Sequence, residues 1–383
     1  MFESPPFWMY VIGFPLLLGP LVTVHELGHY LVGRWFGVHA EAFSIGFGKE
    51  LFGWTDRRGT RWRVSALPLG GYVQFKGDMN PASVPDANAP ADADAFQQAA
   101  LWKRALIVAA GPVTNLLVAI AIFAAFLAIV GERVVVNPEE STIVGGFSDE
   151  GDDPIPSPAR AAGIQVGDRI IAIDGETIGD FSDLKESVVF FPERRFDLTI
   201  ERNSQELTIP VTASRYTMDD GFGNKGDIGL LGVRAVELEE TNVPVPLVDV
   251  IPKSFVLCGK VVDRMVLGIR QIITGQRSIK ELGGPIKIGK VAGERLSMGA
   301  PFFIEFAALI SLNLAFINFL PIPALDGGHL AFYAVEAVRR KPVGPQATEW
   351  AYRTGIALVL TFMVVVTFND VTSLPLIGGL FGS

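Results

Sequence analysis

The residues His25, Glu26 and His29 place two imidazoles and a carboxylate inside a strongly apolar stretch, LVTVHELGHYLVG at 21–33. On a helix, positions four apart share one face, so both imidazoles can point at one metal ion. Glu26 reaches the same side and can act as the general base for a metal-bound water. Ionisable groups at membrane depth are costly and are usually functional. The pattern therefore favours hydrolytic zinc chemistry over a chance match or a hydrogen-bonded histidine pair.

A catalytic zinc ion needs a third protein ligand and an open position for water. The stretch NFLPIPALDGGHL at 318–330 offers both Asp326 and His329 at the membrane level of the first two ligands. Its prolines break the helix, and a broken helix at membrane depth is tolerated where it lines a cavity. Chemistry alone favours Asp326 and leaves His329 open. The remaining candidate, His39, is expected at the surface.

Four apolar segments must position these residues, and each is long enough to cross a bilayer. They cover about 7–36, 102–130, 301–320 and 350–368. With 49% hydrophobic and only 19% charged residues among 383, the chain has the composition of a membrane protein. A net charge of -9 and the lack of a basic run argue against a nucleic-acid partner.

Basic residues indicate how the spans are oriented. Positive charge gathers in the region after the first span and in the loop between the third and fourth: Lys49, Arg57, Arg58, Arg61, Arg63, Lys76, Arg339, Arg340 and Lys341. By the positive-inside rule both regions are cytoplasmic. Both termini and the segment 132–300 then lie on the opposite side. The zinc motif faces the cytoplasmic side.

Five motifs in this order resemble those of the site-2 protease family of intramembrane zinc metalloproteases, in its bacterial regulator of sigma-E protease subgroup. They are HELGH, LPLGGYV (67–73), GPVTN (111–115), LGGPIKI (282–288) and NFLPIPALDGG. The resemblance covers almost the whole chain. It implies that zinc is held by His25, His29 and Asp326, and that Glu26 is the catalytic base.

The same resemblance implies substrate contacts for Asn318 and, more weakly, for Asn115 and Asn313. Hydrogen bonding between helices is the alternative role for all three amides. The region after the first span resembles the family's membrane-reentrant β-structure, with GFGKEL (46–51) at a tip. An exposed strand edge there could pair with an unwound substrate segment.

The stretch SPARAAGIQVGDRIIAIDGETI at 157–178 resembles bacterial PDZ domains. Only one such signature is present, in contrast to the subgroup members with two. The domain either binds a peptide ligand at a sheet edge or excludes bulky substrates. After it, the amphipathic segment 254–275 carries four charges within eleven residues, which favours an interfacial helix over a fifth span.

The predicted fold is a polytopic α-helical membrane protein with four transmembrane helices, a membrane-associated β-hairpin region and one α+β PDZ-like domain. The helical spans are expected at 1–36 (with the zinc motif), 101–131, 301–330 (with the Leu-Asp-Gly motif) and 350–383 (with a C-terminal tail). The other parts are the reentrant β region and loop at 37–100, the PDZ-like domain at 132–240, the interfacial region at 241–300 and a cytoplasmic loop at 331–349.

The predicted function is an intramembrane zinc metalloprotease of a bacterial inner membrane that cuts single-span membrane proteins. Anti-sigma factors or signal-peptide remnants, already trimmed by a first protease, are the expected substrates. Two alternatives stay open. One is a membrane-anchored PDZ peptide-binding module with a structural metal site, against which the intact Glu26 counts. The other is a zinc sensor or transporter, which would need ligands along a path.

Overall fold

The structure of the chain, a computed structural model, describes residues 5–77, 92–136, 140–150, 154–219, 225–236, 240–274, 283–341 and 343–372. Residues 78–91 of the region expected as reentrant β structure and loop at 37–100 lie outside these ranges. So do Leu282 of the fourth motif and the tail after residue 372. By its internal contacts the chain divides into two compact units. The first holds residues 1–125, 251–263 and 283–371, and the second holds 126–250, 264–282 and the C-terminal end.

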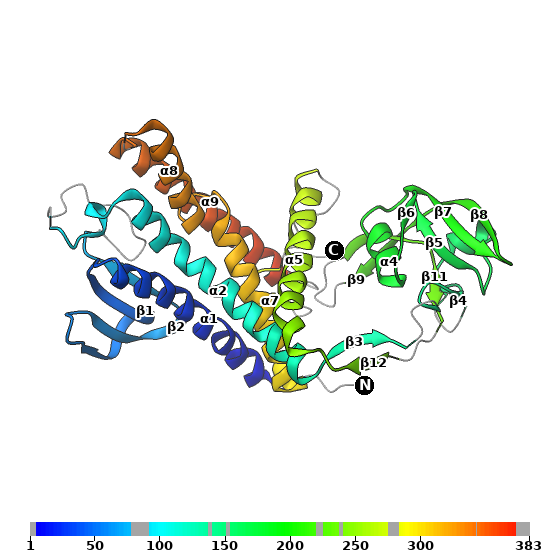
Figure 1. Cartoon of the computed structure of the whole chain (residues 1–383), viewed down its shortest axis with the longest axis horizontal. Coiled ribbons are helices and arrows are strands. Elements are labelled where there is room, and N and C mark those ends of the chain that lie inside the picture. Colours follow the sequence, from blue (N-terminus) through cyan, green and yellow to red (C-terminus); the bar gives the residue numbers. More distant parts are fainter. Residues whose placement is uncertain are drawn as a thin grey trace. The chain divides into compact units, whose positions relative to one another are not determined.

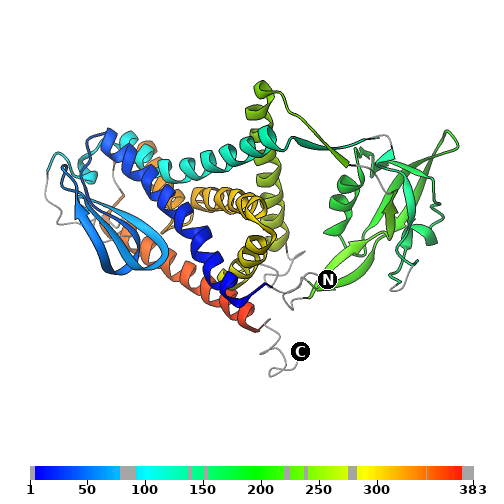
Figure 2. The same cartoon turned by 90° about the horizontal axis from the view of Figure 1, so that it is seen from below.

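Four helices among the described residues are long and apolar enough to cross a membrane, as the sequence predicted. They are α1 (Phe7–Trp35), α2 (Leu101–Ile129), α7 (Ala300–Phe319) and α9 (Pro345–Thr372). A continuous apolar run in lipid can satisfy its own backbone only as a helix. α2 and α7 run side by side in Figure 1 and in Figure 2. Leu312 of α7 belongs to the same apolar cluster as Ala119 and Ile120 of α2.

The amphipathic segment is helical, as expected, and begins earlier than predicted. This helix, α5 (Leu247–Ile273), is not among the four candidate spans. Cys258 near its middle is buried against the cluster formed by α2 and α7. The sequence pattern explains both properties, because apolar residues at helical spacing form one packing stripe and the charges lie outside it.

The fourth motif forms a short helix, α6 (Pro285–Met298), that packs closely on α1. A Cβ added to Gly13 would lie 2.9 Å from the Gly293 nitrogen, so the two backbones nearly touch. The Asp370 carboxylate on α9 accepts the N–H groups of Gly284, Ile286 and Lys287 at distances of 3.0–3.1 Å. It thereby satisfies donors that a helix N-terminus leaves unpaired, and it links α9 to α6.

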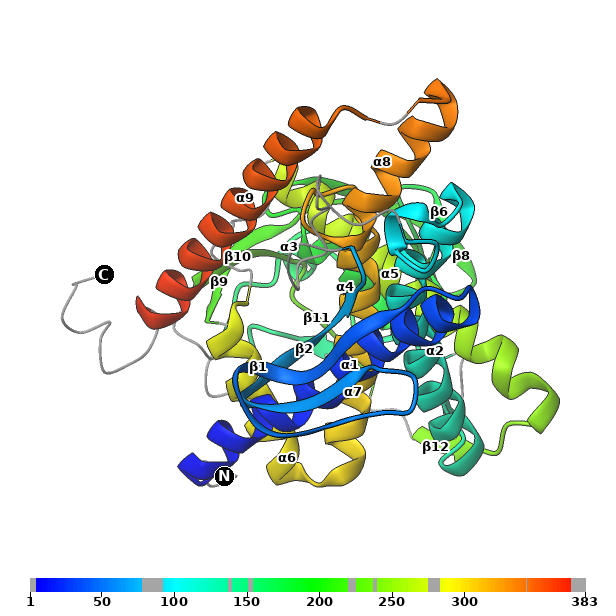
Figure 3. The ribbon, with the colours of Figure 1, turned by 90° about the vertical axis from the view of Figure 1, so that its left-hand side faces the viewer.

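The predicted β region is formed by two long bent strands, β1 (Ala40–Thr55) and β2 (Arg61–Phe75). The first part of β1, at 40–45, pairs with 71–75 of β2 on one side and with 61–64 on the other. The later part of β1, at 50–55, pairs with 61–65. Figure 2 shows the sheet beside α1, and Figure 3 shows the strands in front of that helix. Residues 71–75 therefore form one edge of the sheet.

The third span ends where the prolines predicted a break. α7 stops at Phe319, and α8 (Asp326–Arg339) starts after a six-residue connection. The segment at 331–349, expected as a cytoplasmic loop, is largely helical, because α8 covers 331–339 and α9 already begins at Pro345. Apolar residues recur at helical spacing through 330–338, and this amphipathic pattern extends the helix beyond the motif.

The second unit contains an antiparallel sheet in the order β6-β5-β7-β8 and the helix α4 (Phe181–Val189). Its strands are β5 (Arg169–Ile173), β6 (Glu176–Thr177), β7 (Arg195–Arg202) and β8 (Gln205–Thr212). Three two-stranded pairs and α3 (Pro158–Ala161) complete it: β3 (Glu132–Val135) with β12 (Glu240–Val243), β4 (Val144–Phe147) with β11 (Val233–Ala235), and β9 (Ser214–Asp219) with β10 (Lys225–Leu230). An apolar core joins β4, α3, β5, α4, β7 and β8, and Val233 of β11 packs against it.

Two turns shape the start and the end of β5. Asp174 and Gly175, with φ of 50° and 85°, join β5 to β6 in the left-handed conformations that a tight hairpin requires. Asp168 follows Gly167 at the start of β5 and is buried against Arg202. Burial alone would raise the pKa of Asp168, but the Arg202 guanidinium holds this pKa below its usual range. The ion pair ties the start of β5 to the end of β7.

Candidate metal and catalytic site

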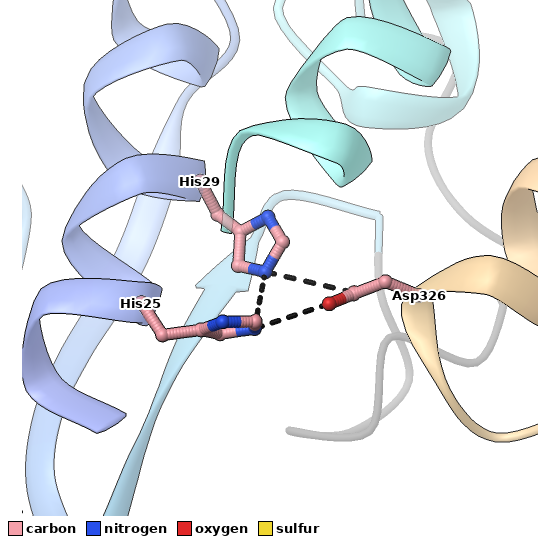
Figure 4. A group of neighbouring side chains, drawn as sticks. All are labelled: His25, His29 and Asp326. Atoms are coloured by element: carbon pink, nitrogen blue, oxygen red, sulfur yellow. Dashed lines mark hydrogen bonds and ion pairs between the residues drawn. The ribbon is translucent and has the colours of Figure 1, made fainter. Parts of the chain in front are cut away.

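Three predicted ligands come together in the first unit (Figure 4). His25 and His29 lie one turn apart on α1, with their Nε2 atoms 3.2 Å from each other. Asp326, at the start of α8, places Oδ2 3.1 Å from His25 Nε2 and Oδ1 3.6 Å from His29 Nε2. One donor atom from each residue lies within 4.8 Å of the others. Two imidazoles and a carboxylate converging on one point are a ligand set that zinc accepts.

Two glycines place Asp326 next to the histidines. A Cβ on Gly327 would lie 2.1 Å from the Leu320 carbonyl oxygen, and a Cβ on Gly328 would lie 2.4 Å from that of Ile322. Any side chain at these positions would collide with backbone, so only glycine lets α8 start so close to the end of α7. The carboxylate that directly precedes the glycines is therefore turned toward α1.

His329, the other candidate for the third ligand, has a different partner. Its imidazole is buried, and its Nδ1 lies 2.6 Å from the Tyr352 hydroxyl on α9. It lines the same cavity but does not belong to the converging donor group. His39 is half-buried beyond the end of α1 and lies outside that group as well.

The helix α2 forms the wall behind both imidazoles. The carbonyl oxygen of Ile107 is 2.8 Å from His29 Nδ1 and accepts its proton, which leaves Nε2 free for a metal. A Cβ on Gly111 would lie 2.3 Å from His29 Nε2 and 2.7 Å from His25 Nε2. The missing side chain thus provides the space in which the donors converge. The donor chemistry and this space together fit a zinc ion.

We expect Gly111→Ala to weaken zinc binding by displacing both imidazoles. Overpacking of a tight site typically costs about 1–3 kcal/mol, which corresponds to zinc affinity lower by about 5- to 150-fold. Titration against a competing chelator measures the effect. Gly259→Ala is the matched control, because a Cβ there meets no atom within 4 Å. Equal zinc affinity in the two variants would contradict the assigned role of Gly111.

Glu26 lies beside the metal ligands in a cavity of about 250 Å³. Its Oε2 accepts the backbone N–H of Val73 at 3.1 Å, so the edge of the β1–β2 sheet fixes the carboxylate. Among the described residues, Oε1 has no hydrogen-bond partner. A carboxylate held by one oxygen next to a metal site can take up a proton on the other.

The three asparagines predicted to contact substrate lie in different surroundings. Asn318, near the end of α7, lines the cavity. Asn115 on α2 also borders the cavity, although its side chain is fully buried, and its Nδ2 lies 3.2 Å from His25 Nδ1. Asn313 is half-buried on α7 and is not among the described residues that line the cavity. The cavity therefore brings Asn318 near the metal site and leaves Asn313 outside it.

Sequence reasoning did not assign functions to Gly111, Val73 or the Ile107 carbonyl. Gly111 and Val73 belong to the motifs at 111–115 and 67–73, which carry the resemblance. The motifs mark these two positions but do not indicate what the residues do. The Ile107 carbonyl carries no signal, because every residue has a backbone carbonyl. Only the packing of α2 against α1 shows that this one accepts a ligand's proton.

Comparison with known proteins gives one family match and close relatives. The family described as peptidase family M50 matches residues 13–362. A protein of Agrobacterium fabrum, provisionally named zinc metalloprotease Atu1380, is 40% identical over 376 residues, covering 95% of this chain and 96% of the relative. Metalloprotease MmpA of Caulobacter vibrioides is 33% identical over 413 residues, covering 98% and 99%.

Proposed function

The chain belongs to peptidase family M50, the site-2 protease family of zinc metalloproteases, and from this premise we propose that it cleaves the transmembrane segments of single-span membrane proteins. The observation that carries the proposal is the converging group of His25, His29 and Asp326 with Glu26 beside it. The ligands of that group lie on or next to helices apolar enough to cross a membrane. A hydrolytic site there meets peptide bonds that a soluble protease cannot reach.

In this proposal His25, His29 and Asp326 hold the zinc ion. When bound, zinc acts as a Lewis acid: it would polarise the substrate carbonyl and lower the pKa of the attacking water. Glu26 accepts the proton of the attacking water on Oε1 and delivers it to the leaving amine. The Val73 N–H keeps the carboxylate oriented during both transfers. Asn318, at the cavity wall, is placed to hold the substrate backbone.

The edge strand at 71–75 supports a way of presenting the substrate. A transmembrane helix must unwind before its peptide bonds can be attacked, and an unwound segment needs partners for its N–H and C=O groups. One side of 71–75 pairs with 40–45, and the N–H of Val73 points to the other side, toward Glu26. A segment paired along the side that faces Glu26 would lie next to the catalytic base.

A groove of about 370 Å³ in the second unit supports a PDZ-like role for that unit. The groove runs between α4 and residues 228–233, and its walls include Leu184, Val188 and Leu230. An apolar channel beside a strand is the kind of site in which PDZ domains bind extended peptides. We propose that this unit binds a peptide or bars bulky substrates.

We further propose that the protein resides in a bacterial inner membrane, in contact with the lipid bilayer. Both termini and the second unit would be extracytoplasmic, with the zinc site toward the cytoplasmic side. The basic residues of the β region and those at 339–341 support this orientation. Substrates would be anti-sigma factor-like proteins or signal-peptide remnants. A first protease would already have removed their bulky domains, which would otherwise keep the transmembrane segment from reaching the zinc site.

Cleavage by the purified protein tests the proposal. In detergent, the protein should cut a single-span substrate within its transmembrane segment, lose this activity with a zinc chelator and regain it when zinc is restored. Mass spectrometry of the products locates the cut. Peptide binding without cleavage would support a binding module instead. Zinc flux in proteoliposomes without cleavage would support a transporter.

A further inference from the structure

The side chain of Asn115 poses a hydrogen-bonding problem next to the metal site. Asn115 is completely buried on α2, with 0% of its surface exposed. Its Nδ2 lies 3.2 Å from Nδ1 of His25, while its buried Oδ1 has no hydrogen-bond partner among the residues that the structure describes. A buried unpaired amide oxygen costs about 1–3 kcal/mol, so the arrangement calls for a physical explanation.

The position of the proton on the neutral His25 imidazole gives that explanation. Nε2 of His25 faces Asp326 and His29 at 3.1–3.2 Å, so Nε2 is the atom available to a metal. A neutral imidazole that donates a lone pair from Nε2 carries its proton on Nδ1. That proton would then point at an NH₂ group, and two donors would face each other. Exchanging the amide oxygen and nitrogen, which have nearly the same shape, removes the clash and pairs the oxygen with the Nδ1 proton, and the NH₂ group then takes the former place of the oxygen.

The other ligand histidine shows the same arrangement without any ambiguity. The Ile107 carbonyl, which can only accept, lies 2.8 Å from His29 Nδ1. Ile107, Gly111 and Asn115 follow each other at intervals of four residues, so they share one face of α2. Along this face, the Ile107 carbonyl faces His29, Gly111 leaves space for the two imidazoles, and the Asn115 amide faces His25. The Ser311 hydroxyl on α7 donates to the Asn115 backbone carbonyl at 2.8 Å. This bond fixes the turn of α2 that carries Asn115.

We propose that Asn115 is a positioning residue that accepts the Nδ1 proton of His25 through its amide oxygen and thereby fixes that imidazole as a metal ligand. The inference rests on the metal site of the proposed function. It gives Asn115 a role different from the substrate contact that the resemblance implied. Asn115 borders the cavity, but its side chain is fully buried and its amide group lies against Nδ1 of His25.

Zinc affinity in three variants tests the proposal. Asn115→Leu keeps the volume and removes the acceptor, and we expect zinc affinity to fall about 10- to 100-fold. Asn115→Asp keeps an acceptor oxygen and should bind zinc at least as tightly as the wild type. Asn313→Leu, the same change on α7 outside the cavity, should leave zinc affinity unaltered. Affinities come from competition with a chelator, so cleavage is not needed as a readout.

The outcomes separate this proposal from the proposed function. Wild-type protein that binds no zinc would contradict the metal site itself. Wild-type zinc affinity in Asn115→Leu, or equally weakened binding in Asn115→Leu and Asn115→Asp, would overturn the positioning role alone. If Asn115→Leu does not fold, ¹⁵N NMR of histidine-labelled wild type decides. Two zinc-bound imidazoles with protonated, slowly exchanging Nδ1 are expected, and a rapidly exchanging His25 Nδ1 proton would refute the bond.

Discussion

Glu26→Gln is expected to reduce cleavage of a single-span substrate by about 100- to 10,000-fold, the range that loss of a positioned general base typically costs. Zinc content should stay at the wild-type level, because Glu26 is not in the converging donor group. The glutamine amide has nearly the same size, and its oxygen can still accept the Val73 N–H. The change therefore removes the proton acceptor and little else. Initial cleavage rates and metal content per chain are the measurements.

A matched control makes this result specific. Glu305→Gln removes a carboxylate that is exposed on α7, away from the cavity, and should leave the rate and the zinc content unchanged. Full activity of Glu26→Gln would show that another group takes the proton. Loss of zinc together with activity would show instead that Glu26 supports the metal.

Asp326→Ala is expected to strip the site of zinc and to abolish cleavage. Loss of an outer partner of a ligand typically costs about 10- to 100-fold in metal affinity, and losing one of three ligands should cost more. His329→Ala should retain zinc, because that imidazole is bonded to Tyr352 and lies outside the donor group. Metal content after dialysis against a weak chelator compares the two variants.

The opposite pattern of zinc content in these two variants would contradict the assignment of Asp326. Zinc retained in Asp326→Ala and lost in His329→Ala would give the third position to His329. Asp227→Ala, which removes an exposed carboxylate of the second unit, controls for the general effect of losing an aspartate. Thermal unfolding of each variant in detergent checks that a change in metal content does not reflect an unfolded chain.

The sequence was enough to predict the long helices of the bundle. Apolar runs of about 20 residues have a single solution in lipid, so α1, α2, α7 and α9 follow from composition alone. The break before α8 could also be predicted, because two prolines cannot continue a helix. The extent of α8 was missed. Its amphipathic residues at 330–338 follow the motif without any stop signal, and they were read as a loop.

The metal site was predictable in its residue types and less so in its arrangement. His25 and His29 share a helix, so their spacing alone fixes their common face. Asp326 and His329 compete because both lie on the same first turn of α8. What separates them is tertiary, since His329 packs on Tyr352 of α9 while Asp326 faces α1. No local pattern reports on packing of that kind.

The ligands proposed for the metal site come from opposite ends of the chain, and this has a mechanical consequence. His29 and Asp326 are 326 − 29 = 297 residues apart. Closing so long a loop costs conformational entropy, and an ion bound to both ends works as a removable cross-link. In this view zinc holds α8 against α1 as well as serving the chemistry. A cell that withdraws the metal would then both silence the protease and loosen its bundle.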